Sequence, residues 1–303
     1  MNAASGPAVP PGLVVVDKPP GLTSHDVVGR LRRILRTRKI GHAGTLDPMA
    51  TGVLVCGVGR ATKLLGHLSL DTKAYTATIR LGAASSTDDA EGELVLGADP
   101  GAVTDAAVAA GIAGLTGAIM QVPSSVSAIR IDGERAYARV RAGEDVVIPA
   151  RPVTVAAFDL LERRGADLDV HVECTSGTYV RALARDLGAG LFVEGRGVGG
   201  HLTALRRTRV GPFVLDRART LDALDADPGL SLTLDEAVAV AFPRRDLTGD
   251  EAADVRHGRP LPASGLTGVH GAFAANGRAL ALMRDRDDLA RPVVVLAPAN
   301  EPA

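Results

Sequence analysis

Apolar residues in the first sixty positions come in short runs that are separated by turn signals. Residues 13–16, Leu-Val-Val-Val, predict a buried strand that ends at the Asp-Lys-Pro-Pro-Gly turn of residues 17–21. Ser24 follows as the expected N-cap of a helix with a basic outer face. Three glycines and a proline then fall within residues 41–52, which predicts a loop of defined shape before a further strand at 53–58.

Strict alternation of apolar and polar residues marks two more strands. In residues 73–81, Tyr75 and every second residue after it are apolar, which predicts a half-buried strand. Residues 168–175 alternate in the same way. They lead through a Ser-Gly-Thr turn into a helix over 179–187, which we expect to stop at Gly188.

Three segments between these strands have a distinctive composition. Residues 85–100 are acidic and rich in glycine, and we expect a surface loop there. The alanine-rich run at 103–115 predicts a helix. Residues 121–152 contain five arginines together with glycines and prolines, and we interpret them as a basic excursion from the sheet.

The pattern changes in the last third of the chain. An acidic stretch at 222–228 ends in a proline that is followed by Gly229, and it precedes a predicted short helix at 234–241. Short apolar segments then alternate with turns as far as a final strand at 293–296. We therefore expect a large domain over 1–240 and a small β-rich domain over 241–303.

Composition indicates a chain that can form a sizeable core without a membrane span. Of 303 residues, 46% are hydrophobic and 23% are charged, and no apolar run approaches the roughly 20 residues of a membrane helix. The first residues lack the basic and apolar segments of a signal peptide, so we expect a cytoplasmic protein. Cys56 and Cys174 stand in apolar runs and are expected to be buried thiols. The histidines show no metal-ligand spacing, so no metal site is predicted.

Charge is distributed unevenly along a chain whose net charge is −1. Residues 1–90 carry 11 Lys and Arg against 6 Asp and Glu, whereas residues 211–303 carry 10 against 14. Basic residues gather at 30–39, in the 121–152 excursion and at 206–209. One such run is usually a solvated face, but three in a nearly neutral chain favour a surface that binds a polyanion such as nucleic acid.

Asp47 and Arg181 are the first candidates for chemistry. Asp47 lies in the glycine-rich loop, where its carboxylate is either a directed functional group or an ordinary turn residue that bonds to its own backbone. Arg181 follows a strand and a turn, and it is either the cation that keeps Asp47 ionised or a solvated helix charge.

Three aromatic or imidazole side chains extend this candidate set. Tyr75 and Tyr179 are two of only three tyrosines, and a tyrosine can stack on a nucleic-acid base as well as fill a core. His42 precedes Asp47 by five residues. It is either a base, a wedge in a nucleic-acid loop, or a loop histidine satisfied by its neighbours.

Taken together, these residues resemble the TruB family of tRNA pseudouridine synthases. The motifs that carry the resemblance span residues 13–210, and their order and spacing make it specific. The matching segments are Asp17 to Ser24, Lys39 to Gly52, Lys73 to Tyr75, Gln121 to Pro123 with Ser127 to Arg130, Cys174 to Arg181, and Leu205 to Thr208.

The resemblance implies a reaction without cofactor or metal. A uridine in the tRNA T-loop, at position 55 of tRNA, is flipped out of the stack. Its glycosidic bond is cut, and the base rotates and rejoins through carbon. The implied fold is the pseudouridine synthase fold, an α/β fold of α+β type. It has a long, mainly antiparallel mixed sheet, a central cleft and a small C-terminal PUA-like domain.

The resemblance also implies a role for each site residue. Asp47 attacks the ribose or the base, or removes a ribose proton, and the sequence does not choose among these. Arg181 keeps Asp47 ionised, and Tyr75 stacks on the uracil. His42 enters the vacated space in the RNA, Tyr179 and Leu205 line the pocket, and Lys18 and Pro19 support the Asp47 loop. Phosphates are expected at Arg30, Arg33, Arg36, Lys39, Arg130, Arg141, Arg206 and Arg207.

The expected partner is the T-arm stem-loop of tRNA, bound by a monomer away from any membrane. Two other interpretations remain open from the residues alone. One is an RNA-binding or RNA-folding module without chemistry, which has no need of Asp47, Arg181 and Tyr75 together. The other is a hydrolase that uses Asp47 on a sugar, which requires a second carboxylate that the motifs do not supply.

Overall fold

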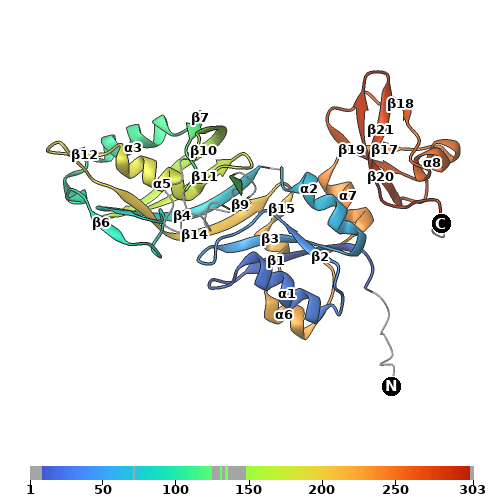
Figure 1. Cartoon of the computed structure of the whole chain (residues 1–303), viewed down its shortest axis with the longest axis horizontal. Coiled ribbons are helices and arrows are strands. Elements are labelled where there is room, and N and C mark those ends of the chain that lie inside the picture. The colour runs from blue at the N-terminus through green and yellow to red at the C-terminus, as the bar shows by residue number, and fades with distance from the viewer. Residues whose placement is uncertain (1–8, 71, 125–129, 132–133, 136–147, 301–303) are drawn as a thin grey trace. The chain divides into compact units, whose positions relative to one another are not determined.

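Figure 1 shows a mixed α/β chain in a computed structural model. The structure describes residues 9–70, 72–124, 130–131, 134–135 and 148–300. The chain divides into two units that interleave in sequence. The first comprises residues 1–48, 52–69 and 210–303, and the second comprises residues 49–51 and 70–209.

The first unit contains the opening strands of the chain and its C-terminal third. One group of its strands has the order β16-β1-β3, with β2 on β3, and all these pairings are antiparallel. Helices α1 and α6 lie side by side against it (Figure 1). The elements up to α7 are β1 (Gly12–Lys18), α1 (Ser24–Ile34), β2 (Ile40–Ala43), β3 (Thr51–Val58), η1 (Gly59–Leu64), α2 (Leu65–Leu68), β15 (Phe213–Val214), η3 (Leu215–Arg217), α6 (Leu221–Ala226), β16 (Leu232–Thr233) and α7 (Leu234–Ala241).

A five-stranded sheet follows in the same unit, with the order β17-β19-β20-β21-β18. Strand β17 runs parallel to β19, and the other pairings are antiparallel. The elements are β17 (Arg244–Asp246), α8 (Gly249–Arg256), β18 (Leu261–Pro262), β19 (Val269–Phe273), β20 (Ala279–Arg286) and β21 (Leu289–Val295).

The first and last strands of the chain share one hydrophobic core. Val15 of β1 and Val55 of β3 belong to the same buried cluster as Val238, Leu282 and Leu296. A second cluster lies between α8 and the five-stranded sheet and includes Val255 and Met283. The five-stranded sheet therefore buries apolar side chains in two separate cores.

The second unit is built on long antiparallel strands. Part of its sheet has the order β14-β4-β11-β10-β7. Helix α3 packs on β10 and α5 packs on β4 (Figure 1). The elements are β4 (Lys73–Leu81), β5 (Ala83–Ser85), β6 (Leu94–Leu96), η2 (Pro100–Ala102), α3 (Asp105–Gly114), β7 (Gly117–Gln121), β8 (Arg130–Ile131), β9 (Glu134–Arg135), β10 (Arg151–Arg164), β11 (Asp167–Cys174), α5 (Val180–Ala189), β12 (Phe192–Val193), β13 (Arg196–Gly197) and β14 (Gly200–Val210).

The structure confirms the predicted α/β class and the strongly patterned elements. Strand β4 has the predicted bounds, and Tyr75, Ala77, Ile79 and Leu81 are all buried. Alternation works here because successive side chains of a strand point to opposite faces of the sheet. Helix α7 also begins and ends where its amphipathic pattern predicts.

Three local predictions are corrected. The N-cap of α1 is Thr23, which forms a capping box with Asp26, so Ser24 is the first helical residue instead. Helix α5 continues through Gly188 to Ala189, with Gly190 as its C-cap. Residues 85–100 are not a plain surface loop, because they include β6 and the buried residues Asp88 and Asp89.

Gly188 lies where helix α5 approaches the backbone before β14. A Cβ at this position would stand 2.1 Å from the nitrogen of Gly200 and 2.3 Å from the carbonyl carbon of Gly199. We expect Gly188→Ala to lower the free energy of unfolding by about 1–3 kcal/mol, since backbone atoms must move to admit the methyl group.

Gly114→Ala is the matched control, because a Cβ at Gly114 in helix α3 meets no atom within 4 Å. Alanine there should stabilise the protein by up to about 1 kcal/mol through its higher helix propensity. Denaturant unfolding of the two variants measures both values. Equal stability of the two would contradict the close packing at Gly188.

Candidate active site

The loop that carries Asp47 joins β2 to β3 and is held on both sides of the carboxylate. Asp47 is half-buried, and its neighbour Leu46 is buried. The Leu46 N–H donates to the Ser24 hydroxyl oxygen at 2.9 Å, and that hydroxyl donates to the Leu46 carbonyl at 3.2 Å. Ser24 thus fixes the backbone directly before Asp47, which is why its side chain does not cap helix α1.

Lys18 fixes the backbone directly after Asp47. Its ammonium group is fully buried and donates to three carbonyl oxygens: those of Leu22 at 2.6 Å, Pro19 at 2.9 Å and Pro48 at 3.2 Å. The Pro48 carbonyl also accepts the N–H of Gly21 at 2.9 Å. An ammonium group has three protons to donate, so these carbonyls replace the water that the buried charge has lost.

The turn between β1 and α1 therefore supports the Asp47 loop through backbone atoms. Pro19 takes part through its carbonyl oxygen, which Lys18 requires. Gly21 has a φ of +80°, and this backbone conformation brings its N–H to Pro48 without the strain that a side chain would cause.

His42 lies on β2, five residues before Asp47, and is half-buried. Its ring meets that of His25 edge-on, with 5.5 Å between the ring centroids. His25 is the second residue of α1 and is exposed, so this pair of imidazoles lies at the start of the basic helix.

The predicted phosphate ligands of the first unit are at its surface. Arg30, Arg33, Arg36 and Lys39 are all exposed, and the first two lie on α1. Arg36 follows α1 with a φ of +50°, a left-handed conformation that turns the chain towards β2. The charged side chains of all four residues are therefore open to solvent.

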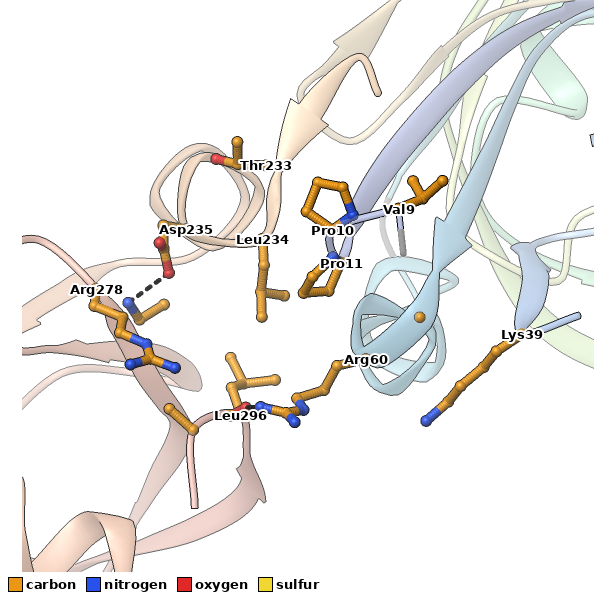
Figure 2. A pocket seen from close by; sticks show the side chains of 13 residues that line it. Val9, Pro10, Pro11, Lys39, Arg60, Thr233, Leu234, Asp235, Arg278 and Leu296 are labelled. Atoms are coloured by element: carbon orange, nitrogen blue, oxygen red, sulfur yellow. Dashed lines mark hydrogen bonds between the residues drawn. The ribbon is translucent and has the colours of Figure 1, made fainter. Parts of the chain in front are cut away.

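Lys39 also lies at the edge of a cavity of about 510 Å³ in the first unit. Figure 2 shows the side chains of Arg60 and Arg278 reaching into this cavity from opposite sides, with Asp235 nearby. Arg60 donates to the Leu296 carbonyl at 2.6 Å, and Asp235 accepts the Ala279 N–H at 2.8 Å. Asp47, His42 and Lys18 do not line it, so this cavity is separate from the Asp47 loop.

In the second unit, Tyr75 and Leu205 belong to the sheet. Tyr75 lies on β4 opposite Val172 of β11 and is 7% exposed. Leu205 lies on β14 and is 8% exposed. Both side chains are held by regular strands, which fix their direction more firmly than loops would.

Arg181 lies in the first turn of α5 and is buried, with 3% of its surface exposed. Its guanidinium donates to the Thr87 carbonyl at 2.7 Å and lies 3.5 Å from the carboxylate of Asp89, which is buried as well. A buried arginine needs such a counter-charge and such acceptors, because its charge cannot be removed by deprotonation. The alternative of a solvated helix charge does not agree with this burial.

A second arginine of α5 lies beside this pair. Arg185 donates to the Asp88 carboxylate at 3.1 Å and to the Val122 carbonyl at 2.7 Å. Asp88 also accepts the Ser124 hydroxyl at 2.6 Å. Burial raises the pKa of the Asp88 carboxyl, while Ser124, Arg185 and Arg181 each lower it.

The sequence interpretation missed Asp88 and Asp89 because their segment looked like an acidic surface loop. The sequence feature that could have indicated the pairing was the adjacent Asp88 and Asp89, together with two arginines of the later predicted helix at 179–187. Such a pairing spans more than 90 residues, so only the fold reveals it.

The remaining predicted phosphate ligands all lie in the second unit, and the two whose side chains are described differ in how far they are exposed. Arg206 is half-buried and donates to the Thr51 hydroxyl at 3.3 Å. Arg207 is only 1% exposed, so its guanidinium does not present a surface charge. Arg130 lies on β8, whose side chains are not described, and Arg141 lies outside the described residues.

Neither thiol offers an accessible nucleophile. Cys56 and Cys174 are buried and form no disulfide. Burial raises the pKa of the Cys174 thiol to about 11, although the Thr178 hydroxyl acts in the opposite direction.

Among the described residues, no group of three His, Cys, Asp or Glu side chains forms a metal site. No described helix has both the length and the hydrophobicity needed to cross a bilayer.

Two family models match the chain in succession. Residues 32–180 match the TruB family pseudouridylate synthase N-terminal domain. Residues 242–297 match the C-terminal domain described as tRNA pseudouridine synthase II. The first match contains Asp47 and Tyr75, and the second falls on the five-stranded sheet.

Curated relatives match nearly the whole chain. The tRNA pseudouridine synthase B of Nocardia farcinica is 64% identical over 291 residues, covering 95% of this chain and 94% of its own. That of Rhodococcus jostii is 58% identical over 307 residues and covers 99% of both chains.

Solved structures share the fold at lower identity. A chain of the archaeal box H/ACA sRNP Nop10-Cbf5 complex is 26% identical with a TM-score of 0.70, and covers 95% of this chain and 87% of its own. A chain of a Cbf5-Nop10-Gar1 complex is 25% identical with a TM-score of 0.72, covering 95% and 85%. From these matches and the motifs around Asp47, the chain belongs to the TruB family of pseudouridylate synthases.

Proposed function

We propose that this chain is an isomerase that converts the uridine at position 55 of tRNA, in the T-loop, to pseudouridine. Its relatives in Nocardia farcinica and Rhodococcus jostii carry the name tRNA pseudouridine synthase B, and they match it along nearly the whole chain. The observation that carries the proposal is the Asp47 loop: Ser24, Lys18 and Gly21 hold the backbone on both sides of one half-buried carboxylate.

The protein contributes to this reaction mainly by positioning the uridine and by supplying charged groups around it. The N-glycosidic bond of the uridine breaks, the uracil turns, and a carbon of the ring bonds to the ribose. A proton leaves that carbon and another is gained at the freed nitrogen, so the base keeps its composition and no electrons are exchanged. No cofactor is therefore required. The target base must leave its stack to reach the protein.

Asp47 is assigned the central role, as a nucleophile or as a base. It must be ionised for either role. Arg181 is assigned as the cation that stabilises this ionised form, because a guanidinium in a buried setting interacts strongly with a carboxylate. The burial of Arg181 and its bonds to Thr87 and Asp89 support this role, since they leave its side chain little freedom.

The other site residues are assigned to the substrate. Tyr75 stacks on the flipped uracil, with Tyr179 and Leu205 lining the pocket. His42 fills the space that the base vacates, and Lys18 and Pro19 maintain the Asp47 loop. Arg30, Arg33, Arg36 and Lys39 bind phosphates of the T-arm, which their exposure supports. Arg206, Arg130 and Arg141 are proposed to bind further phosphates, whereas Arg207 is left out because it is buried.

Two further assignments concern the whole molecule. We propose a catalytic domain over residues 1–240, with an RNA-contacting insertion at about 121–152, and a small C-terminal PUA-like domain over 241–303. The family match at 242–297 and the start of β17 at Arg244 support the boundary. We also propose that the protein acts as a monomer in the cytoplasm, where tRNA is available.

Asp47→Asn tests the assignment of the chemistry. The amide has the shape of the carboxylate but neither its charge nor its basicity, so we expect pseudouridine formation on an unmodified tRNA transcript to fall by at least about 10³-fold. Binding of the same transcript should change by less than about threefold, because phosphate contacts supply most of the affinity. Asp216→Asn, at an exposed aspartate of the same unit, is the control. A near-normal rate for Asp47→Asn would reject the mechanism.

Lys18→Met tests the support of the Asp47 loop. The side chain keeps its length but removes the Lys18 donor from the carbonyls of Pro19, Leu22 and Pro48, of which Pro48 keeps the Gly21 N–H. We therefore expect a rate loss on the order of 10–100-fold with little change in tRNA affinity. Lys63→Met is the matched control, since exposed Lys63 donates to the single carbonyl of Val295 at 2.9 Å. Equal single-turnover rates for the two variants would contradict the role of Lys18.

Salt dependence tests the basic face. Each phosphate neutralised should contribute about −0.7 to −0.9 to the slope of log affinity against log salt concentration. We expect Arg30→Gln with Arg33→Gln to make this slope shallower by about 1.5 units, measured by filter binding of tRNA. Arg259→Gln, at an exposed arginine paired with Asp254, should leave the slope unchanged. An unaltered slope for the double variant would remove these residues from the interface.

A further inference from the structure

The turn that leads into helix α5 is held by side chains and backbone from two neighbouring strands. It joins β11 to α5 and contains Gly177, whose φ is +93°. The Thr175 N–H donates to the Thr154 carbonyl of β10 at 2.9 Å, and the Thr175 hydroxyl oxygen accepts the Thr154 N–H at 3.0 Å. The turn is thus attached to β10 at its first residue.

Gln121 holds the other end of the turn. Its side-chain oxygen accepts the Tyr179 N–H at 2.8 Å, and its side-chain nitrogen donates to the Tyr179 carbonyl at 3.1 Å. Gln121 is the last residue of β7 and is fully buried. A carboxamide is a neutral side chain that offers a donor and an acceptor side by side, as a peptide group of a neighbouring strand would.

Arg151 holds the ring of the same tyrosine. Its guanidinium carbon lies 5.1 Å from the centroid of the Tyr179 ring, and the guanidinium also donates to the Gly177 carbonyl. Arg151 is the first residue of β10 and stands directly opposite Gln121 in the β7–β10 pairing. The cross-strand pair of Gln121 and Arg151 therefore contacts both the backbone and the ring of Tyr179.

Helix α5 begins at the residue that Gln121 and Arg151 contact. Tyr179 is the N-cap of α5, but its side chain makes no capping hydrogen bond. Serine, threonine, asparagine or aspartate normally fills this position and bonds the first free N–H groups itself. Here the Tyr179 carbonyl accepts the Leu183 N–H at 3.2 Å as the first helical bond, and Gln121 binds the same peptide unit from β7.

We infer that Gln121 and Arg151 are positioning residues for the reaction: together they set the direction of the Tyr179 ring and of Arg181 two residues later. This inference rests on the proposed function, in which Tyr179 lines the uracil pocket and Arg181 stabilises Asp47. An error of about 1 Å in such groups can cost about 100-fold in rate. The bonds of Gln121 and Arg151 to the turn oppose such an error.

Gln121→Glu is the decisive variant because the carboxyl has the shape of the amide. When protonated, it donates to the Tyr179 carbonyl and accepts the Tyr179 N–H, which restores both bonds. When ionised, it has no proton for the carbonyl and repels it. Burial raises the pKa of this carboxyl and the Arg151 guanidinium on the opposite residue lowers it, so the variant is followed over a range of pH.

The measurement is the single-turnover rate of pseudouridine formation, taken as a ratio of variant to wild type from pH 6 to pH 9. At the alkaline end we expect the ratio to be reduced on the order of 10–100-fold, with tRNA affinity unchanged. The ratio should recover as the pH falls, by up to about tenfold per pH unit, which is the limit for titration of one group. A role in filling space alone would give a ratio that is independent of pH.

Met120→Glu is the matched control. Met120 is the preceding residue of β7 and its side chain is 64% exposed, so the same new charge meets solvent. Its ratio to wild type should stay flat over this pH range. The wild-type rate in the same experiment tests the proposed function separately: if wild type forms no pseudouridine, that function fails, whatever Gln121 does.

Fluorotyrosine NMR gives a readout that does not need activity. The chain has only three tyrosines, so 3-fluorotyrosine labelling yields three signals, and Tyr179→Phe identifies the one from Tyr179. In Gln121→Glu this signal should differ from that of wild type by an amount that changes with pH, and in Arg151→Lys it should move because a point charge replaces the planar guanidinium over the ring. Arg151→Lys also tests the inference if Gln121→Glu does not fold. For Arg151→Lys we expect a lower rate at unchanged tRNA affinity. An active wild type combined with wild-type rates and an unmoved signal in the variants would overturn the inference.

Discussion

The Asp47 loop depends on one buried ammonium group. Lys18 is fully buried, and its three donors meet the carbonyls of Pro19, Leu22 and Pro48. These contacts join the turn after β1 to the residue that follows Asp47. The loop therefore has its shape before any substrate arrives, which is the condition under which a charged group contributes most to a transition state.

In the second unit, guanidinium groups hold the backbone in a similar way. Arg181 is buried against Asp89 and the Thr87 carbonyl, and Arg185 joins Asp88 to the Val122 carbonyl. In both units a cationic side chain donates to backbone carbonyls and so fixes the chain around it, and in the second unit carboxylates add to these contacts. Buried charges that were poorly matched would destabilise the fold, so this arrangement favours a single conformation at the proposed site.

The sequence predicted the parts of this site that depend on local pattern. Alternation predicted β4 and its buried Tyr75, and the glycine-rich pattern predicted the loop on which Asp47 lies. Residues whose role depends on distant partners were not predicted: Asp89 pairs with Arg181 across more than 90 positions, and Gln121 binds Tyr179 across 58. The prediction that Arg207 carries a surface charge was wrong for a related reason. Its burial is decided by tertiary packing rather than by residue type.

The core shared by the two ends of the chain also constrains how the protein is made. Val15 is synthesised long before Leu282 and Leu296, yet all three pack in the same cluster. At about 5–20 residues per second, a ribosome needs roughly 15–60 s to add the intervening chain. During that time the strand that carries Val15 has an incomplete core, and its apolar side chains are open to aggregation or chaperone binding until the partner strands are made.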